Sequence, residues 1–561
     1  MAKFFGWLPV FLLFIHCQEK PVADVLLVNG KIYSMEHQEA IYNALAIKGE
    51  RILGVGSQED LLPFQGGSTK LIDLQGHTVL PGFTDSHVHP ISGGLSFLEC
   101  DLAELTNIYE ILDSLRRFAE HNPERTWIRG ENAWLAGFAG GNPDKRLLDS
   151  IIPGRPVFVS SLDGHSAWVN SQALQKAGIS RETADPPQGR VERYTSSGEP
   201  SGTLREKAIG LVSSLLPLYT AEDRRKALVA ALKMANSLGI TSLVEASAGR
   251  EFIDTYLELA KAGELTAHVN ISLYADLSKG TAGVAPVLEL NQRYRAAGSD
   301  VKFDQVKLFM DGVVEGKTAA MLENYIHEHH AGIPNADDST AIQMIKALDK
   351  AKFQVHVHAI GDRGIRTSLD AFEQARRENG AQDLRHHIAH LQVIHPQDIP
   401  RFRALDVIAN FQALWATWED SYMSELNYPF LGPERAEWQY PIGTVAKTGA
   451  TIVFGSDWPV STMNPWHALQ VAVTRRGPDT LQREPWTPQH VLEVYPVLEG
   501  YTRHGSYMMH REDETGTLTP GKLADFIVVD QDPMTADRFH LMETKVLHTY
   551  FKGKKVFSRF E

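Results

Sequence analysis

Two histidines stand two residues apart in the stretch PGFTDSHVHP, residues 81–90, directly after an apolar run and a Pro-Gly pair. Side chains of a β-strand alternate between its two faces, so a strand here would point His87 and His89 the same way. Two imidazoles on one face at a strand end can hold a single cation. Two solvent-exposed histidines in a turn would give the same sequence pattern, so the pair has to be judged together with the rest of the chain.

Four further candidate strands end in a side chain that can bind a metal ion or move a proton. VKLFMDG carries Lys307, VHVHAIGD carries His358, HHIAHLQ carries His390 and VFGSDWP carries Asp457. Lys307 and His358 are 51 residues apart, and His358 and His390 are 32 apart, which in each case leaves room for one strand–helix unit. The 67 residues between His390 and Asp457 leave room for two units. Together with the histidine pair, these intervals place the candidates on strands one, four, five, six and eight.

The residues between these motifs favour a parallel barrel. Strand-like runs such as GITSLVEA alternate with helical stretches such as RRKALVAALKMANSL between about residues 81 and 506. We therefore predict an α/β fold, an eight-stranded (β/α)8 TIM barrel, with its active site at the carboxyl ends of the strands. His89 and Lys307 are 218 residues apart, more than three barrel units need, so we expect an inserted subdomain at about residues 127–215.

Both ends of the chain differ from the barrel in their composition. Residues 21–80 and 507–561 contain short β-rich runs separated by turns, with few helical stretches, and we expect them to form one small β-domain together. Residues 1–20 are expected to be an export signal and tether. Lys3 precedes an apolar run of 12 residues, which is too short to span a bilayer as a helix, and Cys17 follows it.

The N-terminal segment resembles a bacterial lipoprotein signal, which implies export to the periplasm or cell surface and membrane attachment through an acylated Cys17. A buried N-terminal hydrophobic segment is the alternative. The net charge of −14, without a basic cluster, argues against a nucleic-acid binder. Cys17 and Cys100 are the only cysteines, so metal ligands would be nitrogen and oxygen atoms. We expect a small-molecule substrate as the partner, and the sequence leaves open whether the chain is a monomer or a homo-oligomer.

Seven motifs, spread over nearly the whole chain after the signal, resemble the amidohydrolase superfamily, and within it amidohydrolase family 3, the relatives of N-substituted formamide deformylase. They are PGFTDSHVHP, DGHSAWVNSQAL, GRVERYTSSGEPSGTLRE, VKLFMDG, HAIGD, GSDWPV and GTLTPGKLADFIVVD. The resemblance implies the (β/α)8 barrel, a flanking β-sandwich built from both termini, and a centre of one or two divalent metal ions. Imidazole and carboxylate ligands suit zinc and similar ions.

The resemblance also implies which residues bind metal, namely His87, His89, Lys307, His358, His390 and Asp457. The first two histidines would bind the more buried ion, and the two later histidines would bind the second. Asp457 would bind the first ion and shuttle protons. Lys307 would be carboxylated on its amine and bridge the ions, because a bare ammonium beside a cation is repulsive whereas the carboxylated form is an anion with two oxygens.

The expected reaction is metal-assisted hydrolysis of a non-peptide C–N bond, such as that of an N-acyl amine, a formamide or a cyclic amide. Metal ions lower the pKa of bound water toward neutrality and polarise the scissile carbonyl. Asp457 would accept the proton of the attacking hydroxide and deliver it to the leaving nitrogen. Two alternatives stay open: a lactonase or esterase that uses the same hydroxide, and a non-catalytic surface protein that binds a small ligand.

Several residues are candidate substrate contacts. Trp134, His165 and Trp168 lie in the expected insert, where aromatic rings can build an apolar pocket with a polar edge, although a place in the core of the insert explains them equally well. Asp311 follows the strand of Lys307 and is a further candidate, with ligand orientation or turn chemistry as alternatives. After GITSLV the family commonly has an aspartate-containing turn, whereas this chain has EASAG with Glu245, near what we take as the third strand, which carries no expected ligand. This departure from the family pattern concerns the orientation of the substrate and not metal binding.

Overall fold

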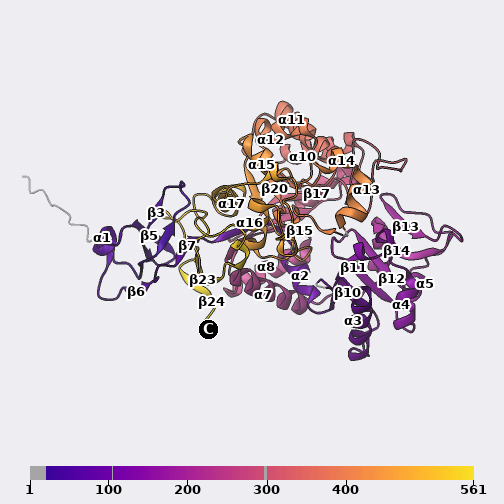
Figure 1. The fold of residues 1–561 in the computed structure, drawn as a ribbon, viewed down its shortest axis with the longest axis horizontal. Helices are drawn as coiled ribbons and strands as arrows, with labels where there is room; N and C mark the ends of the chain where they lie inside the picture. Colours follow the sequence, from indigo (N-terminus) through magenta and orange to yellow (C-terminus); the bar gives the residue numbers. More distant parts are fainter. Residues whose placement is uncertain (1–20, 104, 296–299, 421, 561) are drawn as a thin grey trace, which may run out of the picture.

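The computed structural model describes residues 21–103, 105–295, 300–420 and 422–560, so the predicted export signal and Cys17 lie outside the described residues. Figure 1 shows three parts along the long axis: small β-sheets at one end, a central barrel surrounded by helices, and a separate sheet with its own helices at the other end. Within the described ranges, no helix is both long enough and apolar enough to cross a membrane.

The central sheet consists of eight parallel strands that lie side by side in their order along the chain. They are β8 (Phe83–Val88), β15 (Ile240–Ala248), β16 (His268–Tyr274), β17 (Val301–Phe309), β18 (Gln354–Ala359), β19 (His387–His390), β20 (Ile408–Phe411) and β21 (Ile452–Phe454). Two backbone hydrogen bonds join the first strand to the segment after the last: the N–H of Asp457 donates to the carbonyl of His87 at 2.7 Å, and the N–H of His89 donates to the carbonyl of Trp458 at 2.9 Å. The predicted α/β barrel is confirmed.

Helices cover the outside of the barrel, both between successive strands and after the last one. They include α7 (Ala221–Ser237), α8 (Arg250–Ala262), α9 (Val284–Tyr294), α10 (Asp338–Lys350), α11 (Asp362–Asn379), α12 (Ile399–Leu405), α15 (Ile442–Lys447), α16 (Pro465–Thr474) and α17 (Val494–Tyr501). In β17, Val306 and Leu308 belong to the same apolar core as Met344 of α10. Gln305 and Lys307 alternate with them, so they face the barrel interior. The barrel therefore encloses polar side chains where branched apolar ones are usual.

Two small sheets pack together at one end of the molecule. One has the order β5-β4-β1-β6, with β5 at Arg51–Gly56, β4 at Ala44–Lys48, β1 at Val25–Val28 and β6 at Lys70–Asp73. The other has the order β24-β23-β22-β7-β2-β3, with β24 at Lys554–Ser558, β23 at Val546–Phe551, β22 at Phe526–Val529, β7 at Thr78–Pro81, β2 at Lys31–Tyr33 and β3 at Ile41–Tyr42. Leu27 and Leu45 of the first sheet share an apolar core with Val79 and Phe526 of the second. Strands from both ends of the chain thus pair in one sheet.

A third sheet lies between the first and second barrel strands in the sequence and forms the far end of the molecule in Figure 1. Its order is β13-β14-β12-β11-β10-β9, with β13 at Gly189–Arg193, β14 at Pro200–Glu206, β12 at Ser166–Val169, β11 at Val157–Ser161, β10 at Ile128–Ala133 and β9 at Cys100–Asp101. Helices α3 (Ile108–His121), α4 (Lys145–Ile151) and α5 (Ser171–Lys176) accompany it. The inserted segment therefore starts before residue 127, because β9 and α3 belong to it.

Candidate metal centre

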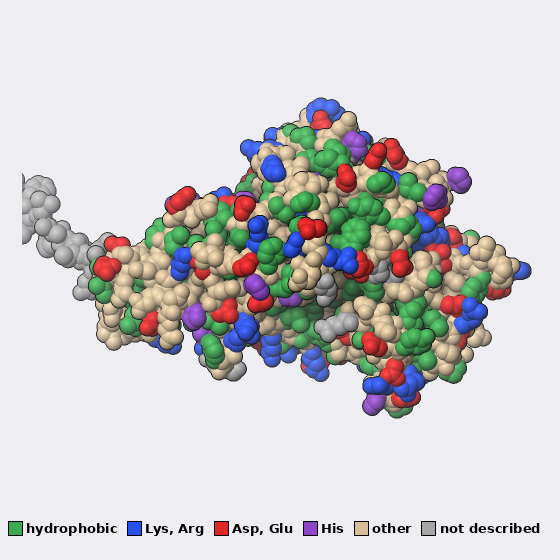
Figure 2. Space-filling model, in the orientation of Figure 1, with side chains coloured by type: hydrophobic (Ala, Val, Ile, Leu, Met, Phe, Trp, Pro, Cys, Tyr) green, Lys and Arg blue, Asp and Glu red, His purple; other side chains and the backbone are tan. Residues whose placement is uncertain are grey.

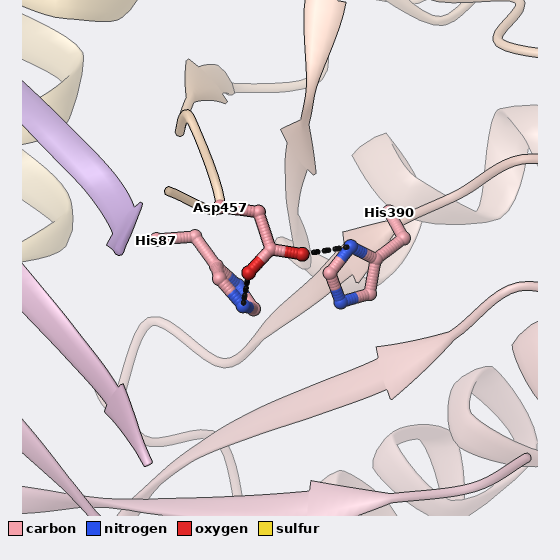
Figure 3. A group of neighbouring side chains, drawn as sticks. All are labelled: His87, His390 and Asp457. Carbon is pink, nitrogen blue, oxygen red and sulfur yellow. Dashed lines mark ion pairs between the residues drawn. The ribbon is translucent and has the colours of Figure 1, made fainter. Parts of the chain in front are cut away.

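Three potential ligand atoms converge at the carboxyl end of the barrel (Figure 3). Nε2 of His87 lies 3.4 Å from Oδ1 of Asp457, and Nδ1 of His390 lies 3.7 Å from Oδ2 of the same carboxylate. One ligand atom from each residue lies within 4.8 Å of the other two, and all three residues are buried. Two imidazole nitrogens and a carboxylate oxygen are the donors that zinc and similar ions prefer.

The hydrogen bonding of the trio agrees with a metal site. Nδ1 of His390 is buried and has no hydrogen-bond partner among the residues that the structure describes. A buried polar atom without a partner is unfavourable, and a coordinated cation would satisfy its lone pair. The residues present therefore fit a divalent metal ion.

His89 and His358, two further predicted ligands, border this trio. Nε2 of His89 is 3.3 Å from Oδ1 of Asp457. The ring centroid of His358 is 4.5 Å from that of His390, although its Nε2 faces the carbonyl of Gly312 at 3.3 Å. The family resemblance assigns His87 and Asp457 to one ion and His390 to the other, yet the structure brings one ligand atom of each within 4.8 Å of the other two.

Lys307 brings its amine into the same site from β17. Its Nζ lies 3.3 Å from Nε2 of His87 and 4.8 Å from the centroid of the Phe309 ring, and the residue is completely buried. Burial lowers the pKa of Lys307 to about 7, because the charged ammonium loses its hydration. A substantial part of this amine is therefore neutral near pH 7.

Unusual backbone conformations and one buried carboxylate position the ligands. His390 and Asp457 have φ angles of 77° and 55°, a region that non-glycine residues adopt rarely and that is enriched at functional sites. Oδ1 and Oδ2 of Asp85 accept hydrogen bonds from the N–H and the hydroxyl of Ser456, at 2.9 and 2.6 Å. Asp85 thereby fixes the residue next to Asp457. The sequence-based prediction missed Asp85, although its place two residues before His87 put it on the same face of the strand.

Glu245 is a second carboxylate that acts on a predicted ligand. Its Oε1 lies 3.5 Å from Nδ1 of His89, and the hydroxyl of Tyr256 donates to its Oε2 at 3.0 Å. A carboxylate on the far nitrogen of a ligating histidine fixes the orientation of the ring. The sequence prediction was wrong on its place: Glu245 lies on β15, the second barrel strand, and it contacts a histidine of the metal site rather than the substrate cavity.

The charges in the site depend on one another. Burial alone would raise the pKa of Asp457, but His87, His89 and His390 hold it well below its usual range. Burial lowers the pKa of His87 far below its usual value, so that its ring is neutral as a metal ligand requires. Burial also opposes protonation of His89, yet its contacts with Asp457 and Glu245 raise its pKa to about 9. In the metal-free chain, a proton on His89 therefore takes the place of a cation between two carboxylates.

The site opens into a cavity of about 800 Å³ between the barrel and the inserted sheet. On the face shown in Figure 2, the surface is recessed between these two parts. Trp134 and His165, two of the candidate substrate contacts, line the cavity, and Nδ1 of His165 is 2.9 Å from Oε2 of Glu206. Trp415, which stacks on His390 with ring centroids 5.6 Å apart, and Tyr422 add aromatic walls from the barrel. A cavity of this size suits a small organic substrate.

Two predicted substrate contacts lie elsewhere. Trp168 is fully buried in the inserted sheet, where its indole N–H donates to the carbonyl of Asp144 at 3.1 Å and its ring packs on Phe138. Asp311 is also fully buried, and three backbone N–H groups donate to its carboxylate. Neither residue belongs to the cavity lining. Each side chain satisfies its polar atoms within the protein, which the sequence could not reveal.

Comparison with known proteins decides the family. A model of the amidohydrolase family matches residues 70–557. The chain belongs to the amidohydrolase family. Membership of this family makes the chain a hydrolase.

Individual relatives match the chain over almost its whole length. It is 32% identical over 553 residues to Protein LONG AFTER FAR-RED 3 of Arabidopsis thaliana, covering 96% of this chain and 92% of the relative. It is 24% identical over 550 residues to N-substituted formamide deformylase of Arthrobacter pascens, covering 94% and 98%. The crystal structure of an uncharacterized metal-dependent hydrolase from Pyrococcus horikoshii OT3 has a TM-score of 0.71, with 22% identity, over 92% of this chain and 99% of that chain. The last likeness shows a shared fold.

Proposed function

We propose that this amidohydrolase cleaves a non-peptide C–N bond, such as that of an N-acyl amine, a formamide or a cyclic amide, with zinc as the ion that best suits its donors. The convergence of His87, His390 and Asp457 at the inner end of an 800 Å³ cavity carries the proposal. The formamide deformylase relative, aligned over 94% of this chain, supports an amide-type substrate rather than an ester.

The chain's own residues account for the proton transfers. When bound, a divalent cation at this position polarises a carbonyl group and acidifies water. The Asp457 carboxylate is ionised, because the surrounding histidines keep its pKa low, so it can accept a proton from the attacking water. The same carboxylate then delivers that proton to the leaving nitrogen. Nε2 of His89 lies 3.3 Å from Oδ1 of this carboxylate, so both atoms would face the bound cation.

Lys307 is suited to carboxylation by its surroundings. A neutral amine is required to add to carbon dioxide, and burial supplies one by lowering the pKa of Lys307 to about 7. The amine forms an N–C bond with carbon dioxide and releases one proton, which leaves a carbamate anion. The two carbamate oxygens would add to the nitrogen and oxygen donors around the site. A mass increase of one carbon dioxide on the peptide that contains Lys307 would support this modification.

The test is substrate profiling of purified, metal-loaded protein on N-substituted formamides, N-acyl amines, hydantoins and lactones. We expect turnover of at least one amide class, loss of turnover with a chelator, and recovery with zinc. Asp457→Asn should keep the fold and lower kcat by about 10²- to 10⁴-fold. Asp304→Asn, an exposed aspartate on β17, is the matched control and should retain activity. Hydrolysis of lactones alone would favour the esterase alternative, and a protein with neither metal nor turnover would overturn the proposal.

A further inference from the structure

A row of buried polar side chains runs from His87 into the barrel, away from the cavity. Nδ1 of His87 lies 2.8 Å from Nε2 of His356 on β18. Nδ1 of His356 lies 2.9 Å from the hydroxyl of Ser272 on β16. The Ser272 hydroxyl donates to Oε1 of Gln305 on β17 at 2.9 Å. All four side chains are at most 1% exposed, so no solvent competes for these hydrogen bonds.

The metal-facing side of His87 determines which way the row must be hydrogen-bonded. Nε2 of His87 faces Asp457 and Lys307, so this nitrogen needs a free lone pair to bind a cation. A neutral imidazole carries its single proton on one nitrogen, so Nδ1 of His87 must then be the N–H donor. Its partner, Nε2 of His356, must accept.

The next two links make that arrangement possible. If Nε2 of His356 accepts, its Nδ1 carries the proton and needs an acceptor, and the oxygen of Ser272 is 2.9 Å away. The serine can accept there because its own proton goes to the carbonyl oxygen of Gln305. The opposite direction would place a proton on Nε2 of His87 and block its lone pair.

We propose that His356, Ser272 and Gln305 are positioning residues that set the tautomer of His87, so that Nε2 faces the metal position with a free lone pair. The inference rests on the proposed metal site. It gives a function to three buried polar residues of the barrel that are not themselves predicted metal ligands. His356 differs in this respect from His358, which lies two residues further along the same strand and lines the cavity.

Zinc affinity, measured by competition with a chromogenic chelator, tests the row without an activity assay. Ser272→Ala removes the acceptor for His356, and loss of such an outer partner should weaken zinc binding about 10- to 100-fold. Gln305→Glu keeps a side-chain oxygen that can accept the Ser272 proton, so it should retain most of the affinity. Ser368→Ala is the matched control, because Ser368 is a fully buried serine of α11 whose hydroxyl donates to the carbonyl of Gly364.

Neutron diffraction on deuterium-exchanged crystals decides the direction even if a variant fails to fold. We expect deuterium on Nδ1 of His87, on Nδ1 of His356, and between Ser272 and Gln305. Deuterium on Nε2 of His356, or wild-type zinc affinity in a folded Ser272→Ala variant, would overturn the inference. Failure of the wild-type protein to bind zinc at all would instead refute the proposed metal site, so the two failures are distinguishable.

Discussion

Replacing Asp311 should loosen two segments at the carboxyl end of the barrel rather than weaken substrate binding. Its Oδ2 accepts hydrogen bonds from the N–H groups of Ala320 and Gly361, both at 2.8 Å, and its Oδ1 accepts one from Ile360 at 3.0 Å. Ile360 and Gly361 directly follow β18, which carries His358. Asp311 therefore connects the end of the fourth barrel strand to the end of the fifth.

The expected cost follows from the number of donors left without an acceptor. Asp311→Ala leaves three buried N–H groups without an acceptor, and each such group costs about 1–3 kcal/mol of stability. Because water that enters the site would satisfy some of them, we expect the free energy of unfolding to fall by about 3–5 kcal/mol. Asp311→Asn keeps one acceptor oxygen, which can serve Ala320 and Gly361. Only the N–H of Ile360 then lacks an acceptor, which should lower the free energy of unfolding by about 1–3 kcal/mol.

Denaturant unfolding and hydrogen exchange measure this directly. Experiments at pH 8 keep the carboxylate ionised, because burial raises the pKa of Asp311 to about 7. We expect faster exchange in peptides spanning residues 318–322 and 359–362, in the order Ala above Asn above wild type. Asp337→Asn is the control, since Asp337 is an exposed helix cap that asparagine replaces well. A folded Asp311→Ala variant with unchanged stability and unchanged hydrogen exchange but a raised KM would refute this reasoning. It would instead support the sequence-based prediction that Asp311 contacts the substrate.

Three other predictions concern the domain interface and the site. Burial alone would lower the pKa of His268, but the Asp525 carboxylate, 2.8 Å away, raises it. The charged ring therefore stabilises the folded state below about pH 6.5, the pKa of histidine in the unfolded chain. This contribution disappears as the pH rises through the pKa of His268 in the folded state. His268→Gln should therefore reduce the fall in melting temperature between pH 6 and 9, measured by calorimetry. Glu245→Gln should weaken zinc binding about 10- to 100-fold in equilibrium dialysis, because the oriented carboxylate is lost. Gly455→Ala should destabilise the barrel and its zinc site in thermal melts, because the added Cβ would lie 2.6 Å from the backbone nitrogen of His87.

Matched controls separate these effects from the substitutions themselves. His37→Gln changes an exposed histidine, and Glu258→Gln changes an exposed glutamate of α8. Gly249→Ala adds a methyl group that meets no atom within 4 Å. Equal effects in a variant and its control would contradict the corresponding prediction.

The barrel and the strands that carry the candidate site were predictable because the signals are local. In VHVHA the histidines alternate with valines, so one face of a buried strand is polar and the other packs on helices. The intervals between Lys307, His358 and His390 match single strand–helix units, which fixed the strand numbers. Trp134 and His165 also line the cavity, since the insert contributes one wall of it.

The errors concern contacts between segments that are distant in the sequence. Glu245 was placed one strand too late, because the sequence between His89 and Lys307 does not show which β-runs belong to the inserted sheet. The sequence around Trp168 is compatible with a residue that lines a pocket, but its indole N–H donates to a carbonyl inside the insert. Asp311 has three donors from two other segments, and no local motif encodes them.

Anomalous diffraction from crystals of the zinc-loaded protein tests the central claim most directly. We expect a zinc peak at the carboxyl end of the barrel, within bonding distance of His87, His390 and Asp457. A peak elsewhere, for example at the exposed histidine-rich loop around His329, or a hydrolytically active protein without any ion at the barrel, would contradict the account.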